Sequence, residues 1–179
     1  GGRGVGFMQP SRYFADTIWA SDYTKDIRNA NHNFVRLIPV TNSASPLFGQ
    51  TVSTSNPPAG SGVTYPSRVF YPFQSKATTL FSHPSSLYVN PGSSDPIRKY
   101  EVKASAGGTY TDQYMFRLAE TYLLRAEGYV GLGNTTSAAA DINMVRDRAK
   151  ATPVLASDVN LDYILDERAR ELLGETHRR

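Results

Sequence analysis

Three glutamates near the end of the sequence, Glu167, Glu171 and Glu175, are spaced four residues apart. This spacing places side chains on one face of a helix, and two carboxylates that flank a bond are the pair that hydrolyses glycosides. The arginines of the same stretch lie within one or two helical turns of these glutamates: Arg168, Arg170 and Arg178. We therefore interpret the glutamates as part of an ion-pair network, either solvated or interlocked, rather than as a catalytic pair.

Other signatures of catalysis are missing from the sequence. The three histidines, His32, His83 and His177, are scattered without the spacing of metal ligands, and cysteine is absent. The glycine-rich start lacks the lysine of a phosphate-binding loop. We expect no catalytic residue, no metal site and no cofactor. The enzyme alternative is a carbohydrate hydrolase that uses loop carboxylates, for which the candidates are Asp16, Asp22 and Asp26.

Aromatic residues provide the chemistry of sugar recognition. The chain has 11 Tyr, 8 Phe and 1 Trp, and flat rings can cover the C–H faces of a sugar while amides and arginines bind its hydroxyl groups. The candidate ligand-binding residues are Trp19, Tyr13, Tyr23, Arg28, Asn31, Tyr65 and Tyr71. For Trp19 a second interpretation is open, because Phe14, Ala15, Ile18 and Trp19 would face inward on a short helix between Pro10 and Ala20 that Ser11 caps.

Composition limits the partners. The net charge is +3 and the basic residues form no block of the kind that follows phosphates, so we expect no nucleic-acid partner. No apolar run approaches the ~18 residues of a membrane-spanning helix. The first seven residues carry no leader signature, so an export signal, if there is one, is expected upstream.

The second part of the chain has the pattern of amphipathic helices. From about Asp112, one face of a helix is predicted to carry Met115, Leu118, Ala119, Tyr122, Ala126 and Tyr129. The helix should end near Gly131 or Gly133, and Asn134 to Ser137 supply capping residues for a second helix. The stripe of that second helix is Ala138, Ile142, Val145 and Ala149.

A third helix is predicted to open near Asn160, after Pro153 has stopped the second one. Its inward side would carry Leu161, Ile164, Leu165, Arg168 and Leu172. On another side, Asp166 and Arg170 are four residues apart and can pair. Arg117, Glu120, Arg125 and Glu127 are expected to tie their helix to its neighbours.

Residues 39 to 97 show no sustained helical or strand period and contain many turn residues. Their aromatic and aliphatic side chains favour an ordered excursion over disorder. Residues 97 to 103 are a candidate strand, with Tyr100 and Val102 on one face and a turn through Gly107-Gly108 back to Tyr110. We predict a mainly α fold, a tetratricopeptide-like hairpin plus further helices, with long ordered loops and at most a short β-hairpin. The expected division is a loop-rich, ligand-binding part over 1–110 and a helical scaffold over 111–179.

The two helices of the predicted hairpin fit a tetratricopeptide pattern. With Gly133 at the turn, the small and aromatic positions fall on Ala126, Tyr129 and Ala138, and the large apolar position falls on Ile142. Arg125, where leucine is usual, departs from the pattern. A single such repeat cannot bury its faces alone, because stacked neighbours complete the core.

Several segments, in their order along the chain, resemble the SusD/RagB family. The segments are Asp26-Ile27-Arg28, Ile97-Arg98-Lys99-Tyr100, Arg117-Leu118-Ala119-Glu120, Leu123-Leu124-Arg125-Ala126-Glu127, Ile142-Asn143, Val145-Arg146, Arg148-Ala149 and Glu167-Arg168-Ala169-Arg170-Glu171-Leu172. The chain stops at Arg179, shortly after the last of them, so it resembles a C-terminal portion that is truncated at its end.

The resemblance implies a non-catalytic lipoprotein on the extracellular face of the outer membrane. Its partners would be a SusC-type TonB-dependent transporter and an oligosaccharide ligand that it captures in polysaccharide utilisation. Contact with the membrane would come only from a lipid anchor outside this stretch. The alternative is a family member, or a helical-repeat scaffold, whose ligand is a peptide or protein.

Overall fold

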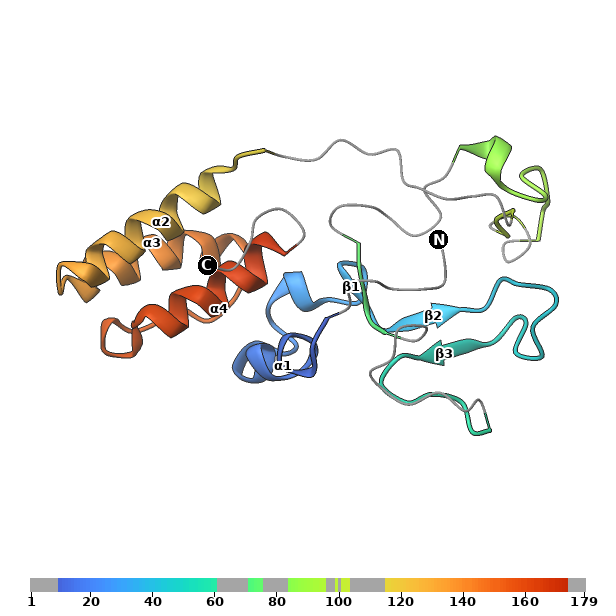
Figure 1. The fold of residues 1–179 in the computed structure, drawn as a ribbon, viewed down its shortest axis with the longest axis horizontal. Helices are drawn as coiled ribbons and strands as arrows, with labels where there is room; N and C mark the ends of the chain where they lie inside the picture. The colour runs from blue at the N-terminus through green and yellow to red at the C-terminus, as the bar shows by residue number, and fades with distance from the viewer. Residues whose placement is uncertain are drawn as a thin grey trace. The chain divides into compact units, whose positions relative to one another are not determined.

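The computed structural model describes residues 10–60, 71–75, 84–95, 99, 101–103 and 115–173 of the chain (Figure 1). Contacts divide the chain into two compact units. Unit 1 comprises Gly1–Ser11 and Phe34–Asp112, and unit 2 comprises Arg12–Asn33 and Gln113–Arg179. Residues 12–33 thus belong to the same unit as the helical part of the chain.

Unit 2 contains the four α-helices of the described residues and three short 3-10 helices. The α-helices are α1 (Arg12–Ala15), α2 (Leu118–Gly131), α3 (Thr135–Arg148) and α4 (Leu161–Leu172). The 3-10 helices are η1 (Thr17–Asp22), η2 (Ile27–Asn29) and η5 (Ala156–Asp158). The predicted mainly helical class, with a hairpin of α2 and α3 and further helices, is confirmed.

The turn between α2 and α3 has the geometry that its residues favour. Gly133 has a φ of 72°, a left-handed conformation that costs glycine little. The Gly133 N–H donates to Val130 O, and the Asn134 N–H donates to Tyr129 O, at 3.0 and 2.8 Å. This is the pattern of a Schellman motif. The Asn134 side chain then caps α3 by accepting from Ser137 N at 3.0 Å, as the sequence predicted.

The core of unit 2 lies between α2, α3 and α4. Its buried members are Ala119, Leu123, Ala126, Ala138, Ala139, Ile142, Val145, Val154, Val159, Ile164 and Leu172. The stripe predicted for the second helix is therefore confirmed, and Ala149 at its end is also buried. Small alanines at the crossing let the α2 and α3 backbones approach closely, which a tetratricopeptide-like pair requires.

The face predicted for α2 was partly wrong. Met115 and Leu118 are 81% and 68% exposed, whereas Leu123 is completely buried. The helix begins at Leu118 rather than near Asp112, so Met115 precedes the helix and the inward positions are those at 119, 123 and 126. Residues 112–114 lie outside the described part of the chain.

Helix α4 starts where the sequence predicted, with the Asn160 side chain accepting from Tyr163 N at 2.8 Å. Ile164 and Leu172 are buried as expected, but Leu161 is 53% exposed, because the first residue of the helix lies at the edge of the core. The expected pairing of Arg170 with Asp166 is replaced by bonds from Arg170 to Glu167 and to the carbonyl of Ile18.

Unit 1 carries two small antiparallel sheets among its described residues. Strand β1 (Phe34–Val35) pairs with β4 (Phe73–Gln74), and β2 (Leu37–Pro39) pairs with β3 (Thr51–Ser53). A 3-10 helix, η3 (Ser85–Leu87), precedes Tyr88, which forms an isolated antiparallel bridge with Val102. This bridge lies within the strand predicted over 97–103, of which residues 97, 98 and 100 lie outside the described part of the chain, as do Gly107, Gly108 and Tyr110.

Candidate functional site

A buried charged cluster in unit 2 is centred on Glu167 of α4, whose side chain is completely buried. Its Oε1 accepts from Arg28 Nη1 at 2.8 Å. Its Oε2 accepts from Arg146 Nη1 at 2.8 Å and from Arg170 Nε at 3.1 Å. Burial by itself raises the pKa of Glu167, but the positive charges of Arg28, Arg170 and Arg146 outweigh it and lower the pKa to about 2.

Glu171 lies one helical turn further along α4 and is 1% exposed. Its carboxylate accepts from Arg28 Nη1 at 3.1 Å, from Arg117 Nη1 at 2.9 Å and from Arg148 Nη2. Arg117 also donates to the backbone carbonyl of Glu171 at 2.8 Å. The two glutamates therefore connect α4 to α3, to the start of α2 and to the segment around η2.

Two aspartates of the N-terminal segment complete the cluster. Asp22 accepts from Arg146 Nη2 at 2.5 Å and from the Thr152 hydroxyl at 2.6 Å. Asp26 accepts two bonds from Arg28, at 2.9 Å from Nε and at 2.6 Å from Nη2. Burial raises the pKa of Asp22, but the bonds from Thr152 and the charge of Arg146 together hold it below its ordinary value.

The arrangement can hold elements together, and it is poorly suited to acid catalysis. A general acid at neutral pH needs a raised pKa, whereas Glu167 has a strongly lowered one. The ion-pair network predicted around these glutamates is thus interlocked, and the carboxylates of Glu167 and Glu171 are buried. Its arginines come mainly from distant parts of the chain, namely Arg28, Arg117, Arg146 and Arg148, with Arg170 from α4 itself. Glu175 and Arg178 lie outside the described residues.

Arg168 faces α2 instead of the neighbouring glutamates of α4. It is 3% exposed, and its guanidinium lies 3.8 Å from Glu120 and 3.6 Å from Glu127. Arg125 of α2 reaches α3 by two bonds of 2.7 Å to Asp141, and it lies over the rings of Tyr122 and Tyr129. The expectation that Arg117, Glu120, Arg125 and Glu127 tie their helix to its neighbours is confirmed.

Trp19 is 2% exposed and lies within the hydrophobic part of the N-terminal segment. Its Nε1 donates to Phe14 O at 2.7 Å, and its ring meets the Phe14 ring edge-on at a centroid distance of 5.8 Å. Phe14, Ala15 and Ile18 are also buried, so these four side chains face inward as predicted. This burial is what the packing interpretation of Trp19 expects.

The other candidate ligand residues occupy several environments. Tyr13 and Tyr23 are 46% and 45% exposed, and the Tyr13 hydroxyl donates to Asp166 Oδ2. Arg28 is an internal member of the charged cluster, with a side chain only 13% exposed. Asn31 is exposed in the same segment as Tyr23. Tyr71 is half-buried in unit 1, and Tyr65 lies outside the described residues.

The residues of the charged cluster were only partly visible in the sequence. The Asp26-Ile27-Arg28 motif resembles a family segment, but the sequence does not predict the roles of Asp22, Arg146 and Thr152. Asp22 and Asp26, which are candidate carboxylates of the hydrolase alternative, are buried members of the ion pairs. Their partners lie more than a hundred positions away in some cases, so no local pattern could indicate them.

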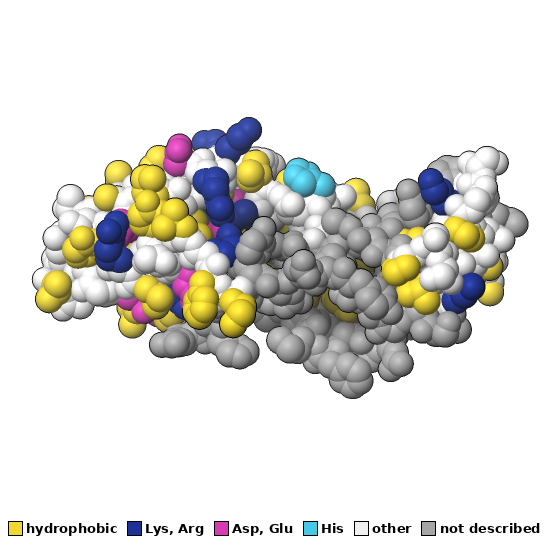
Figure 2. Space-filling view, turned by 90° about the horizontal axis from the view of Figure 1, so that it is seen from above, with side chains coloured by type: hydrophobic (Ala, Val, Ile, Leu, Met, Phe, Trp, Pro, Cys, Tyr) yellow, Lys and Arg dark blue, Asp and Glu magenta, His cyan; other side chains and the backbone are white. Residues whose placement is uncertain are grey.

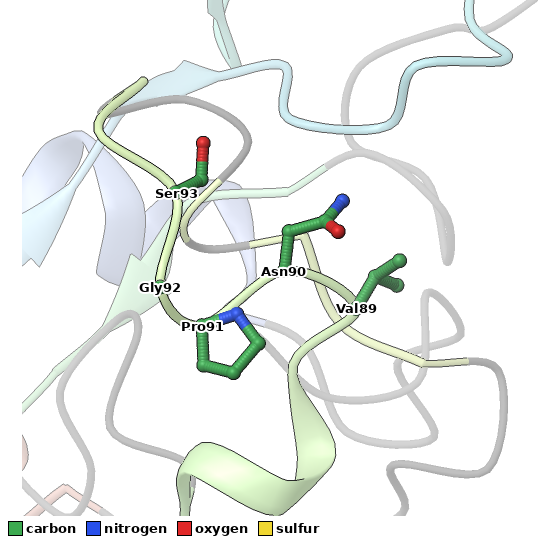
Figure 3. A pocket seen from close by; sticks show the side chains of 5 residues that line it. All are labelled: Val89, Asn90, Pro91, Gly92 and Ser93. Atoms are coloured by element: carbon green, nitrogen blue, oxygen red, sulfur yellow. The ribbon is translucent and has the colours of Figure 1, made fainter.

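A pocket in unit 1 is formed by a single turn of the chain. Its described lining residues are Val89, Asn90, Pro91, Gly92 and Ser93, which Figure 3 shows along one bend of the chain. None of these five residues has a titratable side chain. Among the described residues, no cluster of His, Cys, Asp or Glu has a geometry that could hold a metal ion.

None of the described helices has the length and apolar character needed to cross a bilayer.

Comparisons with known proteins place this chain in a family. Residues 2–179 match the SusD family, so the chain belongs to the SusD family. SusD-like protein P25 of Formosa agariphila is 42% identical over 74 residues, which cover 38% of this chain and 14% of that protein. A solved structure named BT4246 is 39% identical, with a TM-score of 0.36, and the match covers 40% of this chain and 13% of that one.

The match to the family confirms the resemblance seen in the ordered motifs of the sequence. The chain spans about 14% of the length of the curated relative that it matches. Proteins of the SusD family are, in general, non-catalytic binding proteins at the cell surface that serve polysaccharide utilisation, and they work with a SusC partner.

Proposed function

We propose that this chain is part of a surface nutrient-binding protein that captures oligosaccharides without altering them. The captured ligand is delivered to a SusC-type TonB-dependent transporter in the outer membrane. The protein is held on the extracellular face by a lipid anchor outside this stretch. The observation that carries the proposal is the match of residues 2–179 to the SusD family.

The geometry of unit 2 supports a binding role over a catalytic one. Among the carboxylates that a hydrolase would use, Asp22, Asp26, Glu167 and Glu171 are at most 5% exposed and each one accepts bonds from an arginine. Asp16 is half-buried, and Glu175 lies outside the described residues. A carboxylate that is buried and paired in this way has no free face for a substrate. The role that we propose for these carboxylates is to hold the helices of unit 2 together.

The ligand surface of this proposal uses exposed aromatic and amide side chains. Tyr13 and Tyr23 each leave nearly half of their surface accessible, and Asn31 is exposed near Tyr23 in the chain. Rings of this kind cover the apolar face of a pyranose, and an amide binds its hydroxyl groups. In the division that we propose, the helices α2, α3 and α4 are the scaffold, and the loops around them hold the ligand.

A screen of the full-length protein against oligosaccharides and peptides tests this function. Arrays identify the ligand class, and isothermal titration calorimetry on the best ligands gives the affinity and stoichiometry. Saturable oligosaccharide binding is the expected result. Binding of peptides in the absence of any oligosaccharide binding would overturn the proposal in favour of the peptide-binding alternative.

A further inference from the structure

Buried polar side chains hold the segment from Ser21 to Asn33 in place. Asp22, Asp26 and Asn29 are 5%, 2% and 4% exposed. Asp22 binds Arg146 and Thr152 near the end of α3. Asp26 binds Arg28, and Arg28 also donates a hydrogen bond to Glu167. Asp22 therefore fixes the segment to α3, and Arg28, which Asp26 holds in place, fixes it to α4.

Backbone contacts fix the same segment further. The Ile27 N–H donates to Ala149 O at 3.0 Å. The Asn29 side chain donates to Tyr23 O at 2.7 Å, and the Asn33 side chain donates to Ile27 O at 2.6 Å. A segment held at so many points keeps its exposed side chains in defined positions, which lowers the entropy lost when a ligand binds.

The exposed side of the segment is aromatic, polar and basic. Tyr23 is 45% exposed, and Thr24, Lys25, Asn31 and His32 are also exposed. Both carboxylates of the segment, Asp22 and Asp26, are buried and paired with arginines. The charge that this segment shows to solvent is therefore that of Lys25.

The turn after α3 adds an exposed lysine beside this segment. The Ile27–Ala149 bond and a contact of 3.4 Å from Lys25 Nζ to Thr152 Oγ1 join the two stretches. Arg148 and Lys150 are on either side of Ala149; Arg148 pairs with Glu171, and Lys150 is exposed. Asp147 is the exposed carboxylate of the same turn. Figure 2 shows dark blue Lys and Arg side chains gathered on the helical part of the molecule.

We infer that residues 21–33 and 147–152 together form a binding surface for an acidic oligosaccharide, one that carries carboxylate or sulfate groups. This inference rests on the proposed capture of oligosaccharides and names their chemical class. Tyr23 covers a sugar ring, Asn31 binds hydroxyl groups, and Lys25 and Lys150 attract the anionic groups. Asp22 and Asp26 are positioning residues, which act by holding the segment and by keeping carboxylates away from the ligand.

The test is calorimetry on the full-length protein with two sets of oligosaccharides that share a backbone. One set carries uronic acids or sulfate esters, and the other is the neutral or desulfated form. The acidic set should bind at least 10-fold more tightly, and its affinity should fall as the NaCl concentration rises, since exposed charges are screened.

Variants locate the binding surface. Tyr23→Ala and the double substitution Lys25→Ala/Lys150→Ala should each weaken acidic-sugar binding by 10-fold or more. Tyr23→Phe keeps the ring and should stay within about 3-fold of the unsubstituted protein. Lys103→Ala removes an exposed lysine of unit 1 and serves as the charge control. Circular dichroism confirms that each variant is folded.

The outcomes separate this inference from the function on which it rests. Tight binding of neutral oligosaccharides with no preference for acidic ones overturns the acidic class, and the capture function stands. Binding of acidic sugars that Tyr23→Ala and Lys25→Ala/Lys150→Ala leave unchanged overturns the location. Failure to bind any oligosaccharide overturns both this inference and the proposed function.

Discussion

Arg28 Nη1 lies 2.8 Å from Glu167 Oε1, although 139 positions separate the two residues in the sequence. The bond joins the segment around η2 to the middle of α4, inside a cluster where Glu167 also binds Arg146 and Arg170. Removing one partner of such a buried group leaves the others uncompensated, which costs more than the loss of a surface ion pair.

Glu167→Gln should therefore lower the free energy of unfolding by about 3–5 kcal/mol, because three guanidinium groups lose their shared carboxylate. Chemical denaturation at neutral pH measures the change. Asp162→Asn, at an exposed position in the first turn of the same helix, is the matched control and should cost less than about 1 kcal/mol. Equal effects of the two substitutions would contradict the role given to the cluster.

The free energy of unfolding should also depend on pH through Glu167. The pKa of Glu167 is about 2 in the folded protein, below its ordinary value of 4.5. A lowered folded-state pKa contributes stability above the unfolded-state value, and that contribution disappears as the pH falls from about 5 toward 2. The difference in stability between the unsubstituted protein and Glu167→Gln should shrink over this range. A difference that stays constant between pH 5 and pH 3 would argue against a lowered pKa of Glu167 in the folded protein.

Much of unit 2 was predictable from local patterns. Asn134, Gly133 and Asn160 mark helix ends by chemistry that acts within four residues, so the end of α2 and the starts of α3 and α4 follow from the sequence. The face of α2 was harder to predict, because Met115 and Leu118 fit the apolar period as well as Leu123 does. Only the position of the partner helices decides which of them is buried.

The charged cluster and the sheets of unit 1 could not be predicted in the same way. Arg28 and Asp22 meet their partners across 139 and 124 positions, and β1 pairs with β4 although β2 and β3 lie between them in the sequence. Such pairings depend on the packing of whole segments. The same holds for the burial of Asp22, Asp26 and Asn29, since no local pattern marks these polar residues as buried.

The turns that end α2 and α3 give opposite predictions for substitutions that remove or introduce glycine. Gly133 and Lys150 both end a helix with positive φ, 72° and 56°. Gly133→Ala should cost about 1 kcal/mol, because alanine adopts this conformation with strain. Lys150→Gly relieves that strain and should stabilise by up to about 1 kcal/mol, less the greater entropy of glycine in the unfolded chain. Thermal denaturation of the two variants tests this, and a stabilised Gly133→Ala would refute the assignment.

The loss of stability on truncating a leucine of unit 2 should depend on how deeply that leucine is buried. Leu123 is completely buried and Leu132 is 83% exposed. Leu123→Ala should cost about 2–5 kcal/mol through lost apolar contact and a residual cavity, while Leu132→Ala should change stability by no more than about 0.5 kcal/mol. Urea denaturation compares them, and similar losses for both substitutions would be inconsistent with the described core.

Trp19 gives a spectroscopic test of its environment, since it is the single tryptophan of these 179 residues. A side chain that is 2% exposed should emit at short wavelength and resist quenching by iodide. A bound sugar should leave that emission nearly unchanged. If iodide quenches Trp19 strongly, or if a ligand shifts its emission while the fold is intact, the ligand-contact interpretation replaces the packing one.

The most direct test of binding without catalysis is to recover the ligand after binding. The full-length protein is titrated with the best oligosaccharide found in the screen, and the mixture is then analysed by mass spectrometry after prolonged incubation. The account predicts saturable binding, with the oligosaccharide recovered at its original length. Shorter products that accumulate with time and with protein concentration would contradict it and would show that the protein is a hydrolase.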